Sequence, residues 1–595
     1  MREQLLLNGS WQYYLDPKDL GEGRQWMSPS ADRSHWQHTD VPNALDDFGA
    51  PDHPLRGYEG CTWFARTFTV MPGWGKRDLR LVFEGANYLT KVWLNGECLG
   101  SHEGGYTRFS FRIPEHLLRE AEPNLLVVKT ENRSLDGRAP GPIFGWWNQG
   151  GIYREVYLES RSRLHIDDFT VRTYVRGGTV RFELDVSVSN TADADCSDVR
   201  IEWSLLRADR SEAGSGRTTV PALPAGAAHQ AAFEQELHGE RLWSPEDPYL
   251  YDLQIRIDSA SYADAVEASV GLREISVEGT NILLNGKPVY LKGVNRHEDY
   301  PGSGRVHNLQ WLIHDFQFLK QLGVNFIRNS HYPNHPEFYK MADRYGFLVM
   351  NEVPLYFWGD HVRNAAYKDM AALETTEAQL REMIQRDKNH PCIIMWSVSN
   401  ETRGGRDHVD NGNKHLMECA RKLDPTRLVM HVSNHWYKEI YGYVDGALEA
   451  DDVICINEYF GFYTKGQANA MSEIPNFKPY LEAALRDLRD RFPNKPIVIS
   501  EFGCIGLAGV EGDTYPSETF QAAFVNQHME VLTAFPDIAG IVYWEYKDYP
   551  YHKKFVFDHF PVGYYGLVTR DRKPKPVCDV IRKHFNAWHA GEEGV

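Results

Sequence analysis

The stretch IIMWSVSNE, residues 393–401, is an apolar, β-branched run that stops abruptly at a glutamate. A second run of this kind, PIVISEFG at residues 496–503, carries its glutamate at position 501. Apolar runs bounded by polar or turn residues are typical of strands buried on both faces of a parallel sheet. The pattern therefore predicts that Glu401 and Glu501 end two buried strands and face a common pocket.

The alternation of strand and helix extends to both sides of these two runs, from residue 271 onward. Between the first two predicted strands, apolar residues recur at spacings of three and four from Leu309 to Leu322, which predicts an amphipathic helix. The eight predicted strands are residues 289–295, 325–329, 347–352, 393–400, 428–433, 453–459, 497–501 and 538–544. Eight such units predict a (β/α)8 TIM barrel at residues 273–595, with its chemistry at the carboxyl ends of the strands.

The chain before residue 271 has a different rhythm, with short alternating strands separated by Gly, Pro and Asn turns. Asn95-Gly96 is a strong hairpin signal. We expect a β-sandwich over residues 1–163, and the evenly spaced strands of residues 164–272 predict an immunoglobulin-like β-sandwich. The predicted fold class is thus multidomain, β plus α/β.

The composition of the chain narrows its class. Its 595 residues are 42% hydrophobic and 25% charged, as expected of a soluble globular protein. The net charge of −18 argues against nucleic acid or an anionic membrane as partner. The eight cysteines form no CxxC pair. The apolar run near the amino terminus is too short for a signal peptide, and no apolar run in the sequence is long enough to span a membrane. We therefore expect a cytoplasmic protein.

Two carboxyl groups from different strands suit the cleavage of a glycosidic bond. One group protonates the leaving oxygen, and in a retaining enzyme the other, roughly 5–5.5 Å away, forms a covalent glycosyl-enzyme. Glu401 follows Asn400 and an apolar run, so we expect a raised pKa there. We expect Glu501 to stay ionised, hydrogen-bonded by donors such as Arg328 or Tyr459.

Several long motifs resemble those of glycoside hydrolase family 2. The segments NFIRNSHYP (residues 325–333) and DRYGFLVM (residues 343–350) are similar to the first signature of the family, and residues 387–401 to its acid/base signature. HEGGY at residues 102–106 resembles a motif in the sugar-binding, jelly-roll-like sandwich of the family. LNGKP (284–288) and GVNRHE (293–298) resemble motifs at the start of its barrel. The resemblance thus extends along the whole chain.

The resemblance implies a retaining exo-glycosidase in which Glu401 is the general acid/base and Glu501 is the nucleophile. It also implies six residues that line the sugar pocket: Asn400, Arg328, His331, His297, Tyr459 and Trp544. Asn400 is suited to hydrogen-bond a 2-hydroxyl, a contact that strengthens in the transition state. Trp544 is suited to form the floor under the sugar ring, and Tyr459 to orient the nucleophile.

The chain departs from the β-glucuronidases of this family where they bind the uronate carboxylate. They carry Asn-x-Lys before a tail that this chain keeps at residues 566–575, but here the triplet is Gly563-Tyr564-Tyr565. A desolvated carboxylate without a cation is costly, which favours a β-D-galactoside or a related neutral glycoside. A β-hexuronidase, acting on a glucuronide or galacturonide, is the alternative, with a charge from Arg403, Arg406, Lys553 or Lys554.

The family also places an Asp of the first domain in the pocket, and the matching position here is Gly145, in an aromatic loop at residues 144–148. Its loss leaves an arabinofuranosidase or galactofuranosidase as a further alternative. A non-catalytic carbohydrate-binding protein on a decayed barrel is the rival from another class. Retention of both glutamates and of Asn400 argues against that rival.

We expect neither a metal nor a cofactor in the site. Large β-galactosidases of the family bind Mg²⁺ through Glu and His after strand three, where this chain has Tyr356 and Trp358. Pro333, between His331 and His335, argues against a helix that would present both to zinc. The expected partner is a small carbohydrate or glycoconjugate substrate, and the resemblance allows a homodimer or homotetramer.

Overall fold

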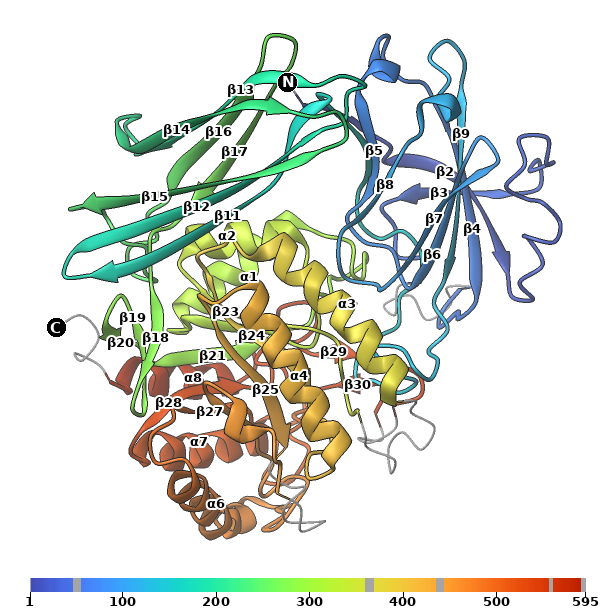
Figure 1. Ribbon diagram of the computed structural model, residues 1–595. Coiled ribbons are helices and arrows are strands. Elements are labelled where there is room, and N and C mark those ends of the chain that lie inside the picture. The colour runs from blue at the N-terminus through green and yellow to red at the C-terminus, as the bar shows by residue number, and fades with distance from the viewer. Residues whose placement is uncertain (1, 47–54, 359–368, 435–443, 556–559, 590–595) are drawn as a thin grey trace.

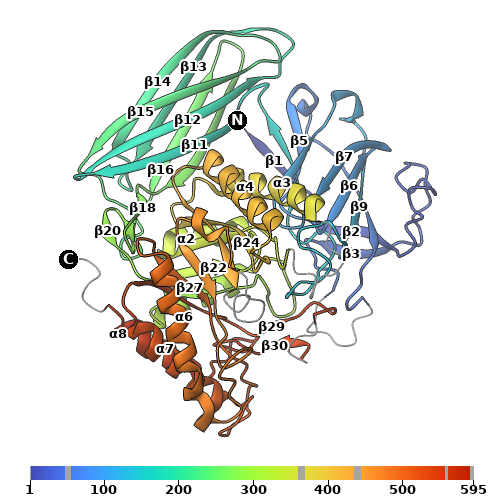
Figure 2. The ribbon, with the colours of Figure 1, turned by 60° about the horizontal axis from the view of Figure 1, so that its bottom comes forward.

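The computed structural model describes residues 2–46, 55–358, 369–434, 444–555 and 560–589. Two β-sandwiches lie beside a barrel of strands and helices, and Figures 1 and 2 show all three from two directions. Short 3-10 helices are η1 (Trp74–Lys76), η2 (Glu115–Leu117), η3 (Leu448–Ala450) and η4 (Met471–Phe477). No helix in the described part of the chain is both long and apolar enough to cross a membrane.

The amino-terminal sandwich consists of two antiparallel sheets. One has the order β1-β10-β5-β8 and the other β3-β2-β4-β9-β6-β7. The predicted Asn95-Gly96 turn joins β6 to β7, and both residues have positive φ, as this hairpin type requires. The strands are β1 (Glu3–Leu6), β2 (Gly9–Asp16), β3 (Gln37–Val41), β4 (Cys61–Phe68), β5 (Asp78–Phe83), β6 (Leu89–Leu94), β7 (Glu97–Glu103), β8 (Phe109–Arg112), β9 (Asn124–Glu131) and β10 (Val156–Arg161).

The middle sandwich also has two sheets, ordered β11-β12-β15 and β14-β13-β16-β17. In β12, buried and partly exposed side chains alternate, so one face of the strand packs on the core. The strands are β11 (Leu164–Arg176), β12 (Thr179–Asn190), β13 (Cys196–Leu206), β14 (Glu212–Leu223), β15 (Ala228–His238), β16 (Tyr251–Asp258) and β17 (Ala263–Val270). A small sheet of β18 (Ile275–Glu278), β19 (Asn281–Leu284) and β20 (Lys287–Pro288) leads into the barrel.

Eight parallel strands close into a barrel in chain order, from β21 to β28. They are the eight strands predicted from the sequence, with ends that differ by at most two residues, so the predicted TIM barrel is confirmed. The strands are β21 (Leu291–Asn295), β22 (Phe326–Asn329), β23 (Leu348–Glu352), β24 (Ile393–Asn400), β25 (Leu428–Asn434), β26 (Ile454–Asn457), β27 (Ile497–Glu501) and β28 (Ile538–Tyr543). Every residue of these strands is buried, which explains why their sequences read as continuous apolar runs.

Helices surround the barrel. The predicted amphipathic helix is α1, which begins where the Asn308 side chain accepts the Trp311 N–H at 3.1 Å. The helices are α1 (Leu309–Gln321), α2 (Pro336–Tyr345), α3 (Asp369–Asp387), α4 (Asp407–Leu423), α6 (Lys478–Arg491), α7 (Glu518–Ala534) and α8 (Val577–Ala587). After β28 the chain forms a short ribbon of β29 (Tyr549–Pro550) and β30 (Val562–Gly563).

Buried polar contacts fasten the amino-terminal sandwich to the barrel. Arg154 Nη2 lies 2.8 Å from Glu298 Oε2, and both side chains are fully buried. Gln379 of α3 donates to the Ala139 carbonyl at 2.9 Å. The segment that precedes β10 is thereby held against the barrel, so side chains of the sandwich take part in the site below.

Candidate active site

Glu401 and Glu501 lie at the carboxyl ends of two barrel strands. Glu501 is the last residue of β27, and Glu401 follows β24 directly, with a φ of 47°. Glu501 is 3% exposed and Glu401 is 5% exposed. The carboxyl ends of parallel barrel strands open at one end of the barrel, so both groups lie at the same end of the fold.

A chain of hydrogen bonds connects the two glutamates. Arg328 donates through Nη1 to Glu501 Oε1 at 2.6 Å and through Nη2 to Asn400 Oδ1 at 2.7 Å. The Asn457 amide donates to the same Asn400 oxygen at 3.1 Å and to Glu401 Oε1 at 2.9 Å. The two carboxyl groups therefore belong to one polar network built from strands β22, β24, β26 and β27.

Both oxygens of Glu501 accept hydrogen bonds from buried donors, because Tyr459 Oη donates to Oε2 at 2.8 Å while Arg328 occupies Oε1. Burial nevertheless raises the pKa of Glu501 to about 8, with Arg328 opposing the rise and the charge of Glu401 adding to it. This direction is opposite to our expectation that Glu501 stays ionised. The expected donors are present, but the cost of burial exceeds their effect.

Glu352, at the end of β23, is a third carboxyl group in this network. It shares the Arg328 guanidinium with Glu501, at 2.8 Å from Nη2, and it also accepts from Ser397 Oγ at 2.7 Å. It is fully buried, and burial raises its pKa as well. Two buried carboxyl groups thus share one guanidinium.

The two histidines predicted for the pocket lie beside these groups. His331 Nδ1 lies 2.7 Å from Glu352 Oε1, and its Nε2 lies 4.0 Å from Glu501 Oε1. Burial, followed by nearby positive groups, holds the pKa of both His331 and His297 well below the usual value, so both rings are neutral. His297 Nε2 is buried and has no hydrogen-bond partner in the described parts of the chain, which suits an atom that binds a sugar hydroxyl.

An aromatic cluster walls the site. Trp544, directly after β28, stacks on His331 with ring centroids 5.3 Å apart, and its ring meets His297 edge-on at 5.6 Å. Trp146 comes from the amino-terminal sandwich, lies 5.7 Å from the His331 ring and donates from Nε1 to Tyr106 Oη at 2.9 Å. The site is therefore completed by the sandwich.

The aromatic loop at residues 144–148 replaces an acidic group with a packed surface. A Cβ at Gly145 would lie 3.0 Å from Tyr356 Oη, which is tighter than ordinary contact. Tyr356 in turn packs edge-on against Trp146, at 5.4 Å between centroids. The position thus has little room for a larger side chain.

Two positions considered for metals serve other purposes. His331 faces Glu352, whereas His335 Nε2 lies 2.9 Å from Glu155 of the sandwich, so the two rings do not converge on one ion. Tyr356 and Trp358, at the positions of the Mg²⁺ ligands of the large β-galactosidases, are both buried, and the Tyr356 ring packs against the rings of His331 and Trp146. Phenol and indole rings are poor ligands for a hard cation.

Two of the four charges proposed for a uronate, those of Lys553 and Lys554, are engaged by the sandwich. Lys553 Nζ and Lys554 Nζ each lie 3.6 Å from Glu59 Oε2 of the sandwich. At the position of the family's Asn-x-Lys, Tyr565 is buried and its hydroxyl hydrogen-bonds the hydroxyl of Tyr463. This corner thus presents the neutral hydroxyl groups of Tyr463 and Tyr565, and Lys575, which donates to the Tyr564 carbonyl at 3.1 Å, is already paired with Asp548 at 2.6 Å.

The structure brings all eight predicted site residues into this one region, and it adds three that the sequence reasoning missed. Glu352 ends a predicted strand, just as Glu501 does, so its position was a usable signal. Asn457 lies at the end of β26, two residues before Tyr459. Trp146 had no such signal, because its place depends on how the sandwich packs on the barrel.

Comparisons with known proteins agree with this architecture. Three family profiles match in succession: the sugar binding domain of glycosyl hydrolases family 2 at residues 5–162, glycosyl hydrolases family 2 at 164–273, and the TIM barrel domain of that family at 275–590. A β-glucuronidase of Paenibacillus borealis is 29% identical over 616 residues, covering 98% of this chain and 97% of the relative. The human β-glucuronidase is 28% identical and covers 100% and 92%.

Solved structures give the same result. The β-glucuronidase of Ruminococcus gnavus in complex with D-glucuronic acid has a TM-score of 0.86 and 26% identity, with 98% of each chain covered. The β-D-glucuronidase of Dictyoglomus thermophilum has a TM-score of 0.85 and 26% identity, covering 98% of this chain and 97% of that one.

Proposed function

Since the chain belongs to glycoside hydrolase family 2, and is an O-glycosyl hydrolase of the exo-acting kind, we propose that it cleaves by double displacement, with Glu501 as nucleophile and Glu401 as general acid/base. The observation that carries this assignment is the hydrogen-bonded network from Glu501 through Arg328, Asn400 and Asn457 to Glu401. It holds two carboxyl groups from different strands in one buried site, as the reaction requires.

In the first step, a Glu501 oxygen attacks the anomeric carbon while the bond to the leaving oxygen breaks, and the Glu401 proton goes to that oxygen. In the second step, Glu401 takes a proton from water, the water oxygen attacks the anomeric carbon, and Glu501 departs as carboxylate. The donors on both Glu501 oxygens, Arg328 and Tyr459, stabilise that departing charge.

The protonation of the site supports these roles. Burial of Glu501 and Glu352 around one guanidinium favours retention of a proton among the carboxyl groups, and interacting acids titrate as a unit. Arg328 and Tyr459 hydrogen-bond Glu501, whereas Glu401 accepts from the neutral amide of Asn457. Donors favour the ionised form of the group that they contact, and a cationic donor does so most strongly, so these contacts favour Glu501 over Glu401 as the carboxylate that attacks.

Asn400 is oriented for the sugar. Its Oδ1 accepts from both Arg328 and Asn457, so the amide cannot rotate without loss of two hydrogen bonds. The Nδ2 group is then left to donate to a substrate hydroxyl. We assign it the 2-hydroxyl, and we assign His297 Nε2 to a hydroxyl farther round the ring.

For the sugar itself, we propose a terminal β-hexuronide, a glucuronide or galacturonide. The support is that the relatives and solved structures described above are named β-glucuronidases and cover nearly the whole chain. Because Gly563-Tyr564-Tyr565 stands in place of Asn-x-Lys, the carboxylate would meet hydroxyl donors, such as Tyr463 and Tyr565, in place of a lysine.

A neutral β-glycoside such as a β-galactoside is the second candidate. The observation in its favour is the neutral corner itself, together with the engagement of Lys553 and Lys554 by Glu59. Burying a carboxylate without a cation beside it costs on the order of several kcal/mol. The arabinofuranoside and galactofuranoside alternatives, which follow from Gly145 in place of the family's Asp, are tested with the same set of substrates.

A panel of nitrophenyl glycosides separates these candidates: β-glucuronide, β-galacturonide, β-galactoside, α-L-arabinofuranoside and β-galactofuranoside. The proposal expects the highest kcat/KM with a hexuronide. A neutral pyranoside or furanoside that is cleaved tenfold faster than either hexuronide would overturn it in favour of the second candidate.

A substitution in the neutral corner gives an independent test. Tyr565→Lys should raise kcat/KM for the glucuronide relative to the galactoside by roughly 10- to 100-fold, because a hydrogen bond to a charged group contributes about 1.5–3 kcal/mol. Tyr565→Phe is the matched control, since it removes the same hydroxyl without adding a charge. Equal ratios for the two variants would show that this corner does not face a carboxylate.

A further inference from the structure

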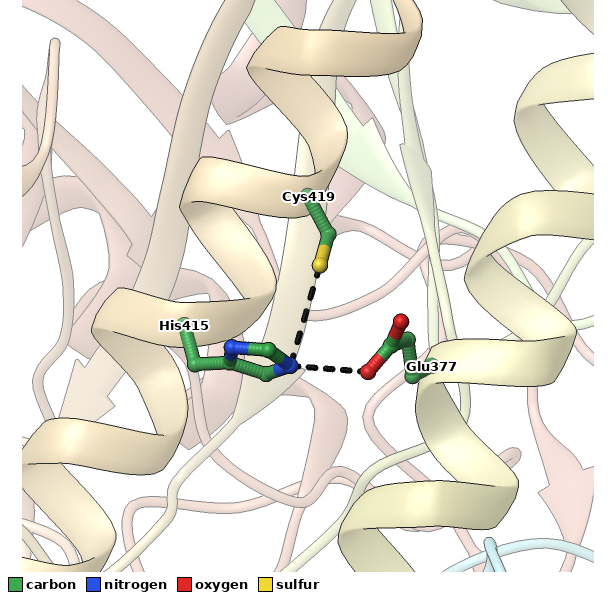
Figure 3. A group of neighbouring side chains, drawn as sticks. All are labelled: Glu377, His415 and Cys419. Atoms are coloured by element: carbon green, nitrogen blue, oxygen red, sulfur yellow. Dashed lines mark hydrogen bonds and ion pairs between the residues drawn. The ribbon is translucent and has the colours of Figure 1, made fainter.

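Three metal-ligating side chains of different types meet on the outer surface of the barrel, away from the site described above. Glu377 belongs to α3, and His415 and Cys419 belong to α4; Figure 3 shows that their side chains point toward one another across the space between the two helices. His415 and Cys419 are four residues apart, so they lie on one face of α4. The packing of α3 against α4 brings the carboxylate to that face.

The distances are close to those of a shared metal ion. His415 Nε2 lies 2.7 Å from Glu377 Oε2 and 3.7 Å from Cys419 Sγ, and the three ligand atoms all lie within 4.8 Å of one another. Zinc binds sulfur at about 2.3 Å and nitrogen or oxygen at about 2.0–2.2 Å, usually as a tetrahedron. Ligand atoms of such a tetrahedron are roughly 3.3–3.8 Å apart, so small side-chain rotations suffice.

The type of ligand selects the type of metal. A thiolate, an imidazole and a carboxylate suit Zn²⁺, whereas Mg²⁺ and Ca²⁺ prefer oxygen ligands alone. Cys419 is buried, while the His415 side chain is 49% exposed, so solvent reaches the open side of the cluster and supplies a fourth ligand. Arg381 binds Glu377 through Oε1 at 2.6 Å, which leaves Oε2 directed at His415.

We propose that Glu377, His415 and Cys419 bind one Zn²⁺ ion, with water as the fourth ligand, and that the ion links α3 to α4. These helices flank β24, the strand that carries Asn400 and leads to Glu401. The ion therefore braces the helix–strand–helix unit that presents the acid/base. Zinc takes no part in the glycosidase chemistry.

Binding requires the Cys419 thiolate. Coordination forms the Zn–S bond and releases the thiol proton to solvent. Affinity therefore increases with pH.

Cobalt(II) titration of the whole protein tests the site, because Co²⁺ occupies zinc sites and a thiolate ligand gives a near-ultraviolet charge-transfer band. We expect the band to saturate at one equivalent, to vanish on addition of Zn²⁺, and to be lost in Cys419→Ser. Cys98→Ser is the matched control, since Cys98 is an exposed free cysteine in the amino-terminal sandwich; it should leave the band unchanged.

His415→Ala provides a second variant, because an exposed helical side chain is removed without disturbing the core. It should weaken Co²⁺ and Zn²⁺ binding at least tenfold and abolish the zinc-dependent rise of a few degrees in the thermal midpoint of the wild type. Activity without added metal should be the same in all variants. A missing charge-transfer band, or a band that survives in Cys419→Ser, would show that these residues form only an ion pair.

Discussion

Arg328 Nη1 lies 2.6 Å from Glu501 Oε1, and this buried contact joins the two halves of the site. The same guanidinium reaches Glu352 and Asn400, so a single side chain positions the nucleophile, a supporting carboxylate and the amide next to the acid/base. Its planar fork of donors matches these three acceptors in a way that a point charge cannot. Catalytic geometry should therefore be unusually sensitive to this residue.

Arg328→Lys should lower kcat/KM by roughly 10²-fold, because a misplacement of about 1 Å at reacting groups has an effect of that size. The charge is kept, so the loss measures geometry. Steady-state kinetics on an aryl glycoside checks it. Arg200→Lys, in an exposed ion pair of the middle sandwich, is the control and should leave kcat/KM unchanged. Normal activity of the Arg328→Lys variant would show that Arg328 does not position the catalytic groups.

Glu401→Ala should lose roughly 10²–10⁴-fold in rate on substrates with poor leaving groups, since general acid catalysis contributes about that much. Substrates with activated leaving groups need no proton, so their first step should be nearly unaffected. Azide, which replaces water without a general base, should restore turnover and give a glycosyl azide of retained configuration. Lack of rescue by azide would contradict the assignment.

The pH dependence of kcat/KM should be bell-shaped. The pKa of Glu501 is raised to about 8 by burial, against Arg328 and with help from the charge of Glu401. Since the active form holds one proton between the two glutamates, activity should fall as the pair loses it above pH of about 8, and again at low pH as a second proton binds.

Glu401→Gln sharpens this prediction. It removes the negative charge that raises the pKa of Glu501, so that pKa should fall and Glu501 should become ionised at lower pH. With an activated substrate, the pre-steady-state burst should then persist to more acidic pH than in the wild type. A burst that requires higher pH in the variant would have the wrong sign.

The stability of the packing between the amino-terminal sandwich and the barrel should depend on pH and on the ion pair of Arg154 with Glu298. Although burial opposes it, the charge of Arg154, followed by that of His335, lowers the pKa of Glu298 from 4.5 to about 2. A depressed pKa of this size contributes about 3 kcal/mol of stability, present above pH 4.5 and lost as the pH falls toward 2.

Arg154→Met should destabilise the protein by roughly 3–5 kcal/mol at pH 7, because Glu298 is left buried and unpaired. Arg154→Met with Glu298→Gln should recover part of that loss, since no charge then remains to be buried. Thermal midpoints of the three proteins check this. A double variant less stable than Arg154→Met would contradict the explanation.

Much of the fold could be predicted from the sequence, because the barrel strands are buried on both faces and appear as apolar runs. For β24 and β27 even the ends agree, since a polar residue must appear where the strand leaves the core. Leu309 was counted in the apolar face of α1 but is 44% exposed; it is the first residue of that helix, and the next residue, Gln310, is exposed as well.

The interactions between the charged groups of the site could not be predicted as well from the sequence. The pKa of Glu501 depends first on its burial, and then on how closely Arg328 and Glu401 approach it. Several strands of the barrel set these quantities together, and no single segment encodes them. The contribution of Trp146 likewise follows from packing between domains. Sequence patterns predict which residues end a strand, while long-range packing decides how their charges interact.

The most direct test is to trap the covalent intermediate. A 2-fluoro glycoside of the sugar that the panel identifies, with an activated leaving group, should inactivate the enzyme with one sugar bound per chain. Mass spectrometry of the digested protein should find the 2-fluoroglycosyl group on the peptide that contains Glu501, and Glu501→Gln should remain unlabelled. A label on Glu401, on Glu352 or on any other residue would contradict the proposed mechanism.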